Sequence, residues 1–386
     1  MRHRPKGGPS ATGRGGSTGS TARLARIREL PLCEASQHEL LAATGDISVE
    51  IVREALRRLR RLGEPGDAQV LRWRIWRADP ALVDDFAACI AAIGDQDAVE
   101  EALAIFRSRG RSYSERVAAL ALLGAFADST TIPAVRSALD DPIAAVRQAA
   151  LRVLRRFPAD AATQQAVAGC LTDNDAQVRA TAVESVNALC HHAGSLLQGL
   201  VGDESILVRA AVARSGAQLG QEPTSRLLAD KEVRVRELAA QHAGTRAILS
   251  LARAARLDHA QPVRQAATRR LGELRAVEAT GQLIDALADR DSLVRVTALR
   301  SLQLIHGGNL PGVLLGAIRD GTCQDCAALV YALGRLGASD ELAALNDDPD
   351  VQIQAALTFA QRELRQAPPA ALPAGRIQPH EKERAR

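Results

Sequence analysis

The sequence predicts an all-α protein made of helical pairs stacked in tandem. Three observations support this fold class. A short segment recurs about every 30 residues through most of the chain. Apolar residues within it are spaced i, i+3, i+4 and i+7, which is the period of an amphipathic helix. No stretch of useful length alternates between apolar and polar residues, as a half-buried β-strand would.

The repeated segment consists of an acidic residue, a short loop, the pair Val-Arg and an alanine- and leucine-rich stretch. Residues 140–154 (DDPIAAVRQAALRVL) and 288–302 (ADRDSLVRVTALRSL) show the pattern. Six copies carry the arginine, with separations of 32, 30, 27, 28 and 31 residues: Arg147, Arg179, Arg209, Arg236, Arg264 and Arg295. Less regular copies continue the register at Arg53, Asp85, Arg116, Cys326 and Gln354, which makes about eleven repeats across residues 35–365.

Each repeat also contains a second amphipathic stretch before the acidic residue, such as IPAVRSAL (132–139) or GQLIDALA (281–288). Because Asp, Asn and Pro in the turn between the two stretches break and cap helices, we expect each repeat to be a pair of helices. One such pair cannot bury its apolar stripe alone. Neighbouring pairs must therefore stack into a solenoid.

The D-x-x-x-x-V-R segment with this period resembles HEAT repeats, especially the short HEAT-like repeats first named from phycobilisome lyases. The resemblance implies a right-handed α-solenoid of about eleven HEAT-like helical pairs. It also implies that the repeated Asp and Arg form a hydrogen-bonded ladder between adjacent repeats, with a structural role. The matching pairs are Asp141 and Arg147, Asp173 and Arg179, Asp203 and Arg209, Asp230 and Arg236, Asp258 and Arg264, and Asp289 and Arg295. The ladder is expected to lapse at Asp85, Cys326 and Gln354.

Positive charge is concentrated at the ends of the chain. The formal net charge is +4. Residues 1–23 contribute +5 and residues 366–386 contribute +2, which leaves −3 for the body between them. We therefore expect a disordered basic Gly/Ser-rich tail over residues 1–23, a repeat array over 24–365 and a disordered Pro/Ala-rich tail over 366–386. A near-neutral body does not support a nucleic-acid footprint covering the whole protein.

No run approaches 18 apolar residues and no secretory signal is present, so the sequence favours a cytoplasmic protein that does not contact membranes. Six cysteines are scattered, and reduced thiols are expected. Cys323 and Cys326 form a CxxC, but a zinc site needs two further ligands, and only His306 is a plausible neighbour. The favoured interpretation is a degenerate repeat with Cys326 in the ladder position. No metal, cofactor or catalytic residue is expected.

A candidate binding ridge lies five residues after each ladder position, on the outward side of the second helix. In HEAT-like arrays the second helices line the concave surface, where solenoids bind their partners. The ridge is rich in arginine and ends in two aromatic residues, a composition typical of binding hot spots. The candidate partner-binding residues are Arg152, Arg214, Arg269, Arg300, Tyr331 and Phe359.

The stretch VLRWRIWRADP (70–80) raises an alternative, because both tryptophans of the chain lie there among arginines. Aligned with residues 132–141, Trp73 falls where Val135 falls and is expected to face inward. Residues 53–77 nevertheless carry a net charge of +5. Arg57, Arg58, Arg61, Arg72 and Arg74 are therefore candidates for anion binding.

These observations favour a non-catalytic scaffold that binds another protein, and the basic ridge favours a partner with an acidic segment. Oligomeric state is not indicated by the sequence. The first alternative is nucleic-acid or polyanion binding through the basic N-terminal end. The second, implied by the resemblance alone, is an enzyme or chaperone like the phycobilin lyases.

Overall fold

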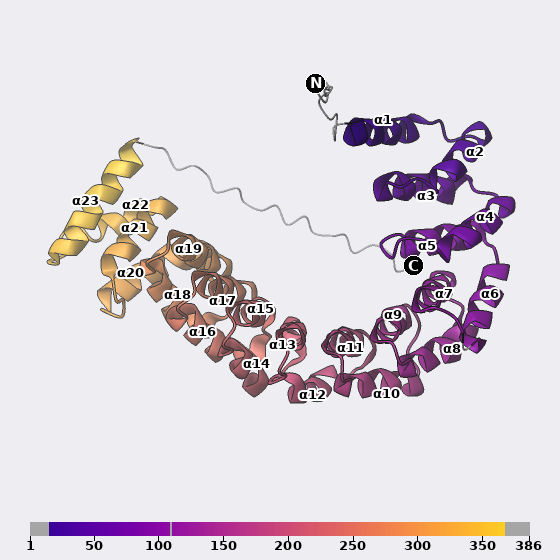
Figure 1. Cartoon of the computed structure of the whole chain (residues 1–386). Coiled ribbons are helices and arrows are strands. Elements are labelled where there is room, and N and C mark those ends of the chain that lie inside the picture. Colours follow the sequence, from indigo (N-terminus) through magenta and orange to yellow (C-terminus); the bar gives the residue numbers. More distant parts are fainter. Residues whose placement is uncertain (1–14, 109, 367–386) are drawn as a thin grey trace, which may run out of the picture. The chain divides into compact units, whose positions relative to one another are not determined.

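The computed structural model describes residues 15–108 and 110–366, and all regular structure within these ranges is helical (Figure 1). The all-α fold class is thereby confirmed. The chain divides into two compact units, residues 1–193 and 194–386, called here the N-unit and the C-unit. Each is a stack of helical pairs.

Two rows of helices build the N-unit. The inner row holds the second helix of each pair: α3 (Val49–Leu62), α5 (Val83–Ile93), α7 (Tyr113–Phe126), α9 (Ala144–Leu154) and α11 (Ala176–Leu189). The outer row holds the first helices: α2 (Glu34–Ala43), α4 (Pro65–Ile75), α6 (Asp97–Arg107), α8 (Ile132–Ser137) and α10 (Ala161–Gly169). Helix α1 (Gly15–Glu29) precedes the pairs and packs on α3.

The C-unit repeats this arrangement. Its inner row is α13 (Ile206–Arg214), α15 (Val233–His242), α17 (Gln261–Glu273), α19 (Ser292–His306), α21 (Cys326–Leu336) and α23 (Val351–Gln366). Its outer row is α12 (Ala193–Leu197), which begins at the boundary, α14 (Gln221–Leu228), α16 (Ile248–Leu257), α18 (Thr280–Asp285), α20 (Leu310–Arg319) and α22 (Ser339–Ala343). Within the unit, consecutive inner helices pack on one another from α13 to α19 and again from α21 to α23, whereas α19 and α21 both pack on α20.

The core of each unit lies between the two rows. The valine of each Val-Arg pair is fully buried: Val146, Val178, Val208, Val235, Val263 and Val294 are each 0% exposed. Outer-row side chains such as Leu71, Val135, Leu251 and Leu283 are also 0% exposed. Burying each such side chain contributes about 1.5–3 kcal/mol, which explains why the repeat keeps an aliphatic residue at these positions.

A glycine permits the close approach of two inner helices in the C-unit. A Cβ on Gly272 of α17 would lie 2.5 Å from Ser301 Oγ and 2.7 Å from Ser301 Cα on α19. Ser301 Oγ donates a 2.9 Å hydrogen bond to the carbonyl oxygen of Thr268, so the hydroxyl joins the two helices. No side chain larger than hydrogen fits at position 272 without a shift of backbone.

The prediction that Trp73 faces inward is wrong. Its side chain is 61% exposed, and the Arg77 guanidinium stacks over its ring at 4.6 Å from the centroid. Helix α4 instead buries Ala68, Leu71 and Ile75. Since apolar residues occur all around this helix, the alignment with residues 132–141 selected the wrong face.

The N-terminal boundary also differs from the sequence prediction. Helix α1 begins at Gly15, so residues 15–23 are helical rather than part of a disordered tail. Residues 1–14 lie outside the described residues. At the other end α23 reaches Gln366, and the predicted tail beyond it, residues 367–386, also lies outside them.

Replacing Gly272 by alanine should destabilise the C-unit, because the new methyl group overlaps Ser301 in the α17–α19 contact. Overpacking of this kind costs about 1–3 kcal/mol. Gly281→Ala is the matched control, since nothing lies within 4 Å of a Cβ on Gly281 in helix α18. Urea unfolding followed by circular dichroism should show a lower midpoint for Gly272→Ala and an unchanged or higher one for Gly281→Ala. Equal midpoints would contradict the close approach.

Candidate partner-binding surface

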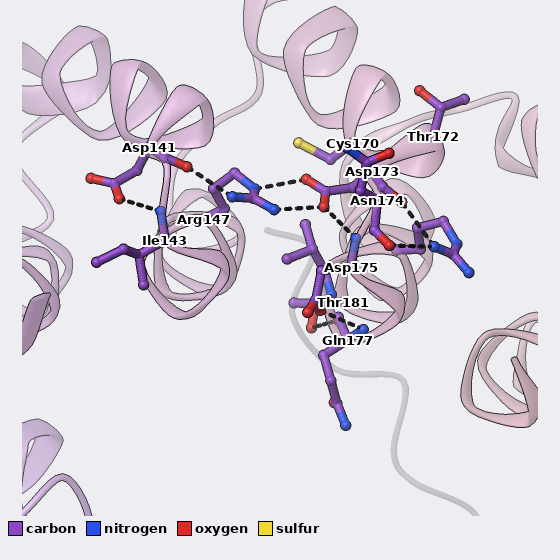
Figure 2. Close-up of polar contacts among 12 residues, drawn as sticks. Asp141, Ile143, Arg147, Cys170, Thr172, Asp173, Asn174, Asp175, Gln177 and Thr181 are labelled. Carbon is purple, nitrogen blue, oxygen red and sulfur yellow. Dashed lines mark hydrogen bonds and ion pairs between the residues drawn. The ribbon is translucent and has the colours of Figure 1, made fainter.

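A ladder of arginine and aspartate side chains joins consecutive repeats (Figure 2). Arg147 donates two hydrogen bonds of 2.7 Å, from Nε and Nη2, to the two carboxylate oxygens of Asp173 in the next repeat. Its Nη1 donates at 2.8 Å to the carbonyl oxygen of Asp141 in its own repeat. Asp173 Oδ1 also accepts from the backbone N–H of Asp175 at 2.8 Å, which holds the turn before α11. One guanidinium is therefore hydrogen-bonded both to the loop of its own repeat and to the loop of the next repeat.

The same geometry recurs along the chain. In the C-unit, Arg209 pairs with Asp230 (2.6 Å), Arg236 with Asp258 (2.7 Å) and Arg264 with Asp289 (2.7 Å). In the N-unit, Arg116 pairs with Asp141. Arg179 and Arg209 likewise donate to the carbonyl oxygens of Asp173 and Asp203 within their own repeats, both at 2.9 Å. Each carboxylate thus accepts from the arginine of the preceding repeat, a direction that sequence reasoning left open.

Ionisation of the ladder aspartates is favoured by their partners. Burial, the largest single influence, raises the pKa of Asp289. The hydrogen bonds from Arg264 and from the Asp291 backbone, with the nearby positive charges, outweigh burial and leave that pKa below its ordinary value. The pKa values of Asp173 and Asp230 are lowered by the same balance.

Two of the three expected gaps in the ladder are partly filled. Asp85 accepts a 2.9 Å hydrogen bond from Arg53, so an ion pair is kept although the aspartate stands in the arginine position. Gln354 donates at 2.9 Å to the carbonyl oxygens of Leu345 and Asp348. The glutamine thereby keeps the hydrogen bonds within its own repeat, but its neutral side chain cannot form the ion pair of the ladder.

The third gap, at Cys326, is a real break. Other inner helices have the ladder residue in their first turn, for example Arg264 as the fourth residue of α17, but α21 begins at Cys326 itself. Asp320, six residues earlier, ends α20 in a helical conformation and precedes Gly321, whose φ is +62°. The loop therefore takes another path, and Arg295 contacts only the carbonyl oxygens of Asp289 and Arg290 among the described residues.

The expectation that all cysteines are reduced is also wrong for this loop. Cys323 and Cys326 form a disulfide, with Cα atoms 5.5 Å apart. His306 is no third ligand for this pair, because its Nε2 lies 2.9 Å from Thr280 Oγ1. Across residues 15–108 and 110–366, no group of three or more His, Cys, Asp or Glu side chains could hold a metal ion.

The predicted ridge residues all lie on inner helices at one equivalent position. Arg152 belongs to α9 of the N-unit, where it is exposed and donates at 3.1 Å to Gln148. The C-unit carries the other five on five different inner helices, and all are exposed: Arg214, Arg269, Arg300, Tyr331 and Phe359. The intervening ridge residue on α15 is Gln241, which bonds Glu237. The C-unit therefore presents a continuous row of such positions from α13 to α23.

A small pocket opens on this row between α15 and α17. Its volume is 230 Å³, and its lining residues are Gln241, His242, Ala266, Arg269, Arg270 and Glu273. Arg270 is held by the carbonyl oxygen of Ala243 at 2.8 Å and by Glu273 at 2.9 Å. Burial first, and then the charges of Arg270 and Arg214, lower the pKa of His242. The imidazole is thus neutral near pH 7 and can donate or accept a hydrogen bond.

Sequence reasoning missed His242, Arg270 and two apolar residues on this face. Val296 (44% exposed) and Leu304 (53% exposed) stand four residues before and after Arg300 on α19. The spacing of four could have shown them, because residues so spaced share one helix face. His242 follows the ridge position directly, and only the packing of α17 against α15 reveals that it lines a pocket.

The arginines proposed for anion binding at the N-terminal end are mostly engaged within the fold. Arg57 pairs with Glu54 at 2.6 Å, and Arg58 donates to the carbonyl oxygens of Arg28 and Leu30. Arg72 pairs with Asp95 at 3.0 Å.

Arg74 of the same group donates to the carbonyl oxygen of Leu41 and to Thr44 Oγ1. Arg61 is exposed and makes no hydrogen bond or ion pair with a described residue. Of the five candidates, four are therefore paired with a carboxylate or hydrogen-bonded to backbone oxygens.

Comparisons with known proteins identify the repeat type. Residues 97–187 match the family model described as HEAT repeats. This confirms HEAT-like repeats within residues 97–187. A search of curated protein sequences gave no match. None of the described helices has the length and apolar character needed to cross a bilayer.

Solved structures with similar folds are distant in sequence. Kap95p, from a structure with RanGDP, is 12% identical with a TM-score of 0.49 and covers 93% of this chain and 60% of its own. The Escherichia coli protein YibA is 15% identical with a TM-score of 0.33, covering 78% and 97% respectively. Human deoxyhypusine hydroxylase is 18% identical with a TM-score of 0.28, covering 91% and 100%.

Replacing Arg264 by alanine should leave the Asp289 carboxylate buried without its cation. The Arg264 side chain is only 3% exposed, and removing one partner of a buried ion pair costs about 3–5 kcal/mol. Arg295→Ala is the matched control, because this arginine occupies the same position and contacts only carbonyl oxygens. Losing those bonds costs about 1 kcal/mol. The urea midpoint should fall much further for Arg264→Ala, and a similar fall in both would refute the role of the carboxylate contact.

Acid should weaken the ladder. An aspartate whose pKa is lowered in the folded state adds stability that is fully present above its ordinary value of 3.8 and is lost as the pH falls below it. The urea midpoint should therefore drop between pH 6 and pH 3. Asp289→Asn should start lower at pH 6 and drop less, since one contributing carboxylate has gone. A variant with an undiminished drop would show that Asp289 does not contribute.

Proposed function

Because the chain carries HEAT-like repeats, we propose that it is a non-catalytic scaffold that binds a partner protein along the inner row, with an acidic segment of the partner facing the arginines. In the C-unit these are Arg214, Arg269 and Arg300. In the N-unit, Arg152 stands at the same position of α9, and we propose it as a partner-binding residue of that unit. Tyr331 and Phe359 would add apolar contact at the end of the row.

The observation that carries this proposal is the repetition of exposed arginine at one position of α13, α17 and α19, with little opposing charge. Glu237 and Glu273 are the acidic residues on the same face of α15 and α17. They already pair with Arg234 at 2.9 Å and Arg270 at 2.9 Å. The face is therefore positive and complementary to an acidic segment, and such complementarity favours fast and specific association.

The rigidity of the row supports the same role. The inner helices from α9 to α19 are each fixed by a buried valine and, through much of the array, by the arginine–aspartate ladder. Side chains on such helices lose little backbone entropy on binding, so more of the contact energy appears as affinity. Binding at several repeats then adds contact area in proportion to the length of the partner segment.

Charge reversal of the ridge tests this proposal. The variant Arg152→Glu, Arg214→Glu, Arg269→Glu and Arg300→Glu should lose the partner in an affinity capture from native lysate, because the face becomes acidic. The control reverses four exposed arginines on or just before outer-row helices: Arg226→Glu, Arg246→Glu, Arg253→Glu and Arg319→Glu. Both variants change the net charge equally, and circular dichroism should show both folded.

Each capture is run with and without nuclease. A protein retained after nuclease treatment, kept by the outer-row variant and lost by the ridge variant, is the expected result. Retention by the ridge variant would refute binding along the inner row. Loss with nuclease from the unaltered chain would instead indicate nucleic acid, whose binding also falls steeply with salt.

A further inference from the structure

The exposed face of the C-unit inner row changes character along its length. From α13 to α19 it carries Arg214, Arg269 and Arg300, together with the pocket at His242. On α21 and α23 it carries Tyr331 and Phe359. The basic part ends on α19 and the aromatic part lies on α21 and α23. Since α19 and α21 both pack on α20, the two parts are near enough for one ligand segment to meet both.

The basic end is suited to a carboxylate. Among the described residues, Arg269 makes no ion pair or hydrogen bond, and its guanidinium borders the 230 Å³ pocket. Arg270 also lines the pocket and is already satisfied by Glu273 and a carbonyl oxygen. His242 adds a hydrogen-bonding nitrogen. The volume is below that of a typical small-molecule site and is sufficient for one acidic side chain.

The aromatic end is suited to an apolar anchor. The rings of Tyr331 and Phe359 meet edge to face with centroids 5.4 Å apart, and the side chains are 43% and 48% exposed. Val296 and Leu304 on α19 are also about half exposed and flank Arg300 on the same helix face. Large apolar side chains gathered on a helical face that faces solvent mark an interaction surface.

The distance between the two ends sets the spacing in the ligand. Packed helices lie about 8–10 Å apart, and α19 and α21 pack on α20, so the span from α17 to α21 or α23 is about 16–40 Å. An extended chain advances about 3.3 Å per residue, which corresponds to about five to twelve residues. A helical ligand would need roughly twice as many residues to span the same distance, so a shorter segment is sufficient in the extended form.

We propose that this face of the C-unit binds an extended peptide segment of a partner protein that carries acidic residues at one end and an aromatic or large aliphatic anchor about seven residues away. The acidic side chains occupy the pocket beside Arg269 and contact Arg300. The anchor packs on Tyr331 and Phe359. This inference rests on the proposed scaffold function and specifies the pattern of its ligand.

Fluorescence anisotropy of the full chain with labelled synthetic peptides tests the pattern. Three peptides share the same acidic cluster in a Gly/Ser/Thr background. The first places a Phe-Leu anchor about seven residues from the cluster, the second about two residues away, and the third has no anchor. The first should bind at least tenfold more tightly than the other two, and equal affinities would overturn the proposal.

Substitutions test which residues bind the anchor of the peptide and which bind its acidic cluster. Phe359→Ala should weaken the first peptide about tenfold and leave the third unchanged, as expected when one aromatic contact is lost. Arg269→Glu should weaken all three. Leu249→Ala, at a side chain 72% exposed on outer helix α16, is the matched apolar control and should change nothing. A Phe359→Ala effect equal for the first and third peptides would overturn the anchor assignment.

Two further outcomes separate this inference from its premise. If ridge charge reversal abolishes partner capture while the three peptides bind alike, the scaffold function stands and the ligand pattern is wrong. If sedimentation velocity shows self-association of the unaltered chain that Phe359→Ala removes, a second copy occupies the face. That result also overturns the peptide assignment.

Discussion

The bidentate ion pair between an arginine of one repeat and the aspartate of the next is the constraint on which the stacking depends. Both groups are largely buried at Arg209 and Asp230, each 7% exposed, so neither charge can be left without the other. Desolvation offsets much of their attraction, and such pairs add specificity more than net stability. A shift of one helical turn would break both hydrogen bonds, so the contact selects one register of stacking.

The ladder also determines which side chains reach solvent. In the inner helices from α9 to α19, the arginine lies in the first turn with its valine neighbour in the core. Five residues later an α-helix has turned by about 140° from the arginine, and the side chain there points away from the neighbouring rows. The exposed row of Arg214, Arg269, Arg300, Tyr331 and Phe359 follows from this geometry, although the residue types within it do not.

The end of the C-unit shows what happens when the constraint is relaxed. At α21 the first helical turn and the ladder charge are both missing, and a disulfide between Cys323 and Cys326 closes the loop instead. At α23, Gln354 keeps the hydrogen bonds to its own loop and supplies no charge. These two helices carry the aromatic residues of the exposed face, so apolar contact replaces basic charge where the ladder ends.

Periodicity alone was sufficient to predict the helical pairs, the positions of the ladder residues and the equivalent outward position on each second helix. Those features repeat, and each copy reinforces the others. Features that occur only once could not be predicted from the sequence. Trp73 was assigned to the core because apolar residues surround α4, and only packing selects Ala68, Leu71 and Ile75 as its inner face. The arginines near it appeared available until the tertiary structure placed Asp95 and backbone carbonyl oxygens within their reach. The pocket at His242 likewise exists only because α17 packs against α15, since a cavity between two helices is a property of their contact and of neither helix by itself.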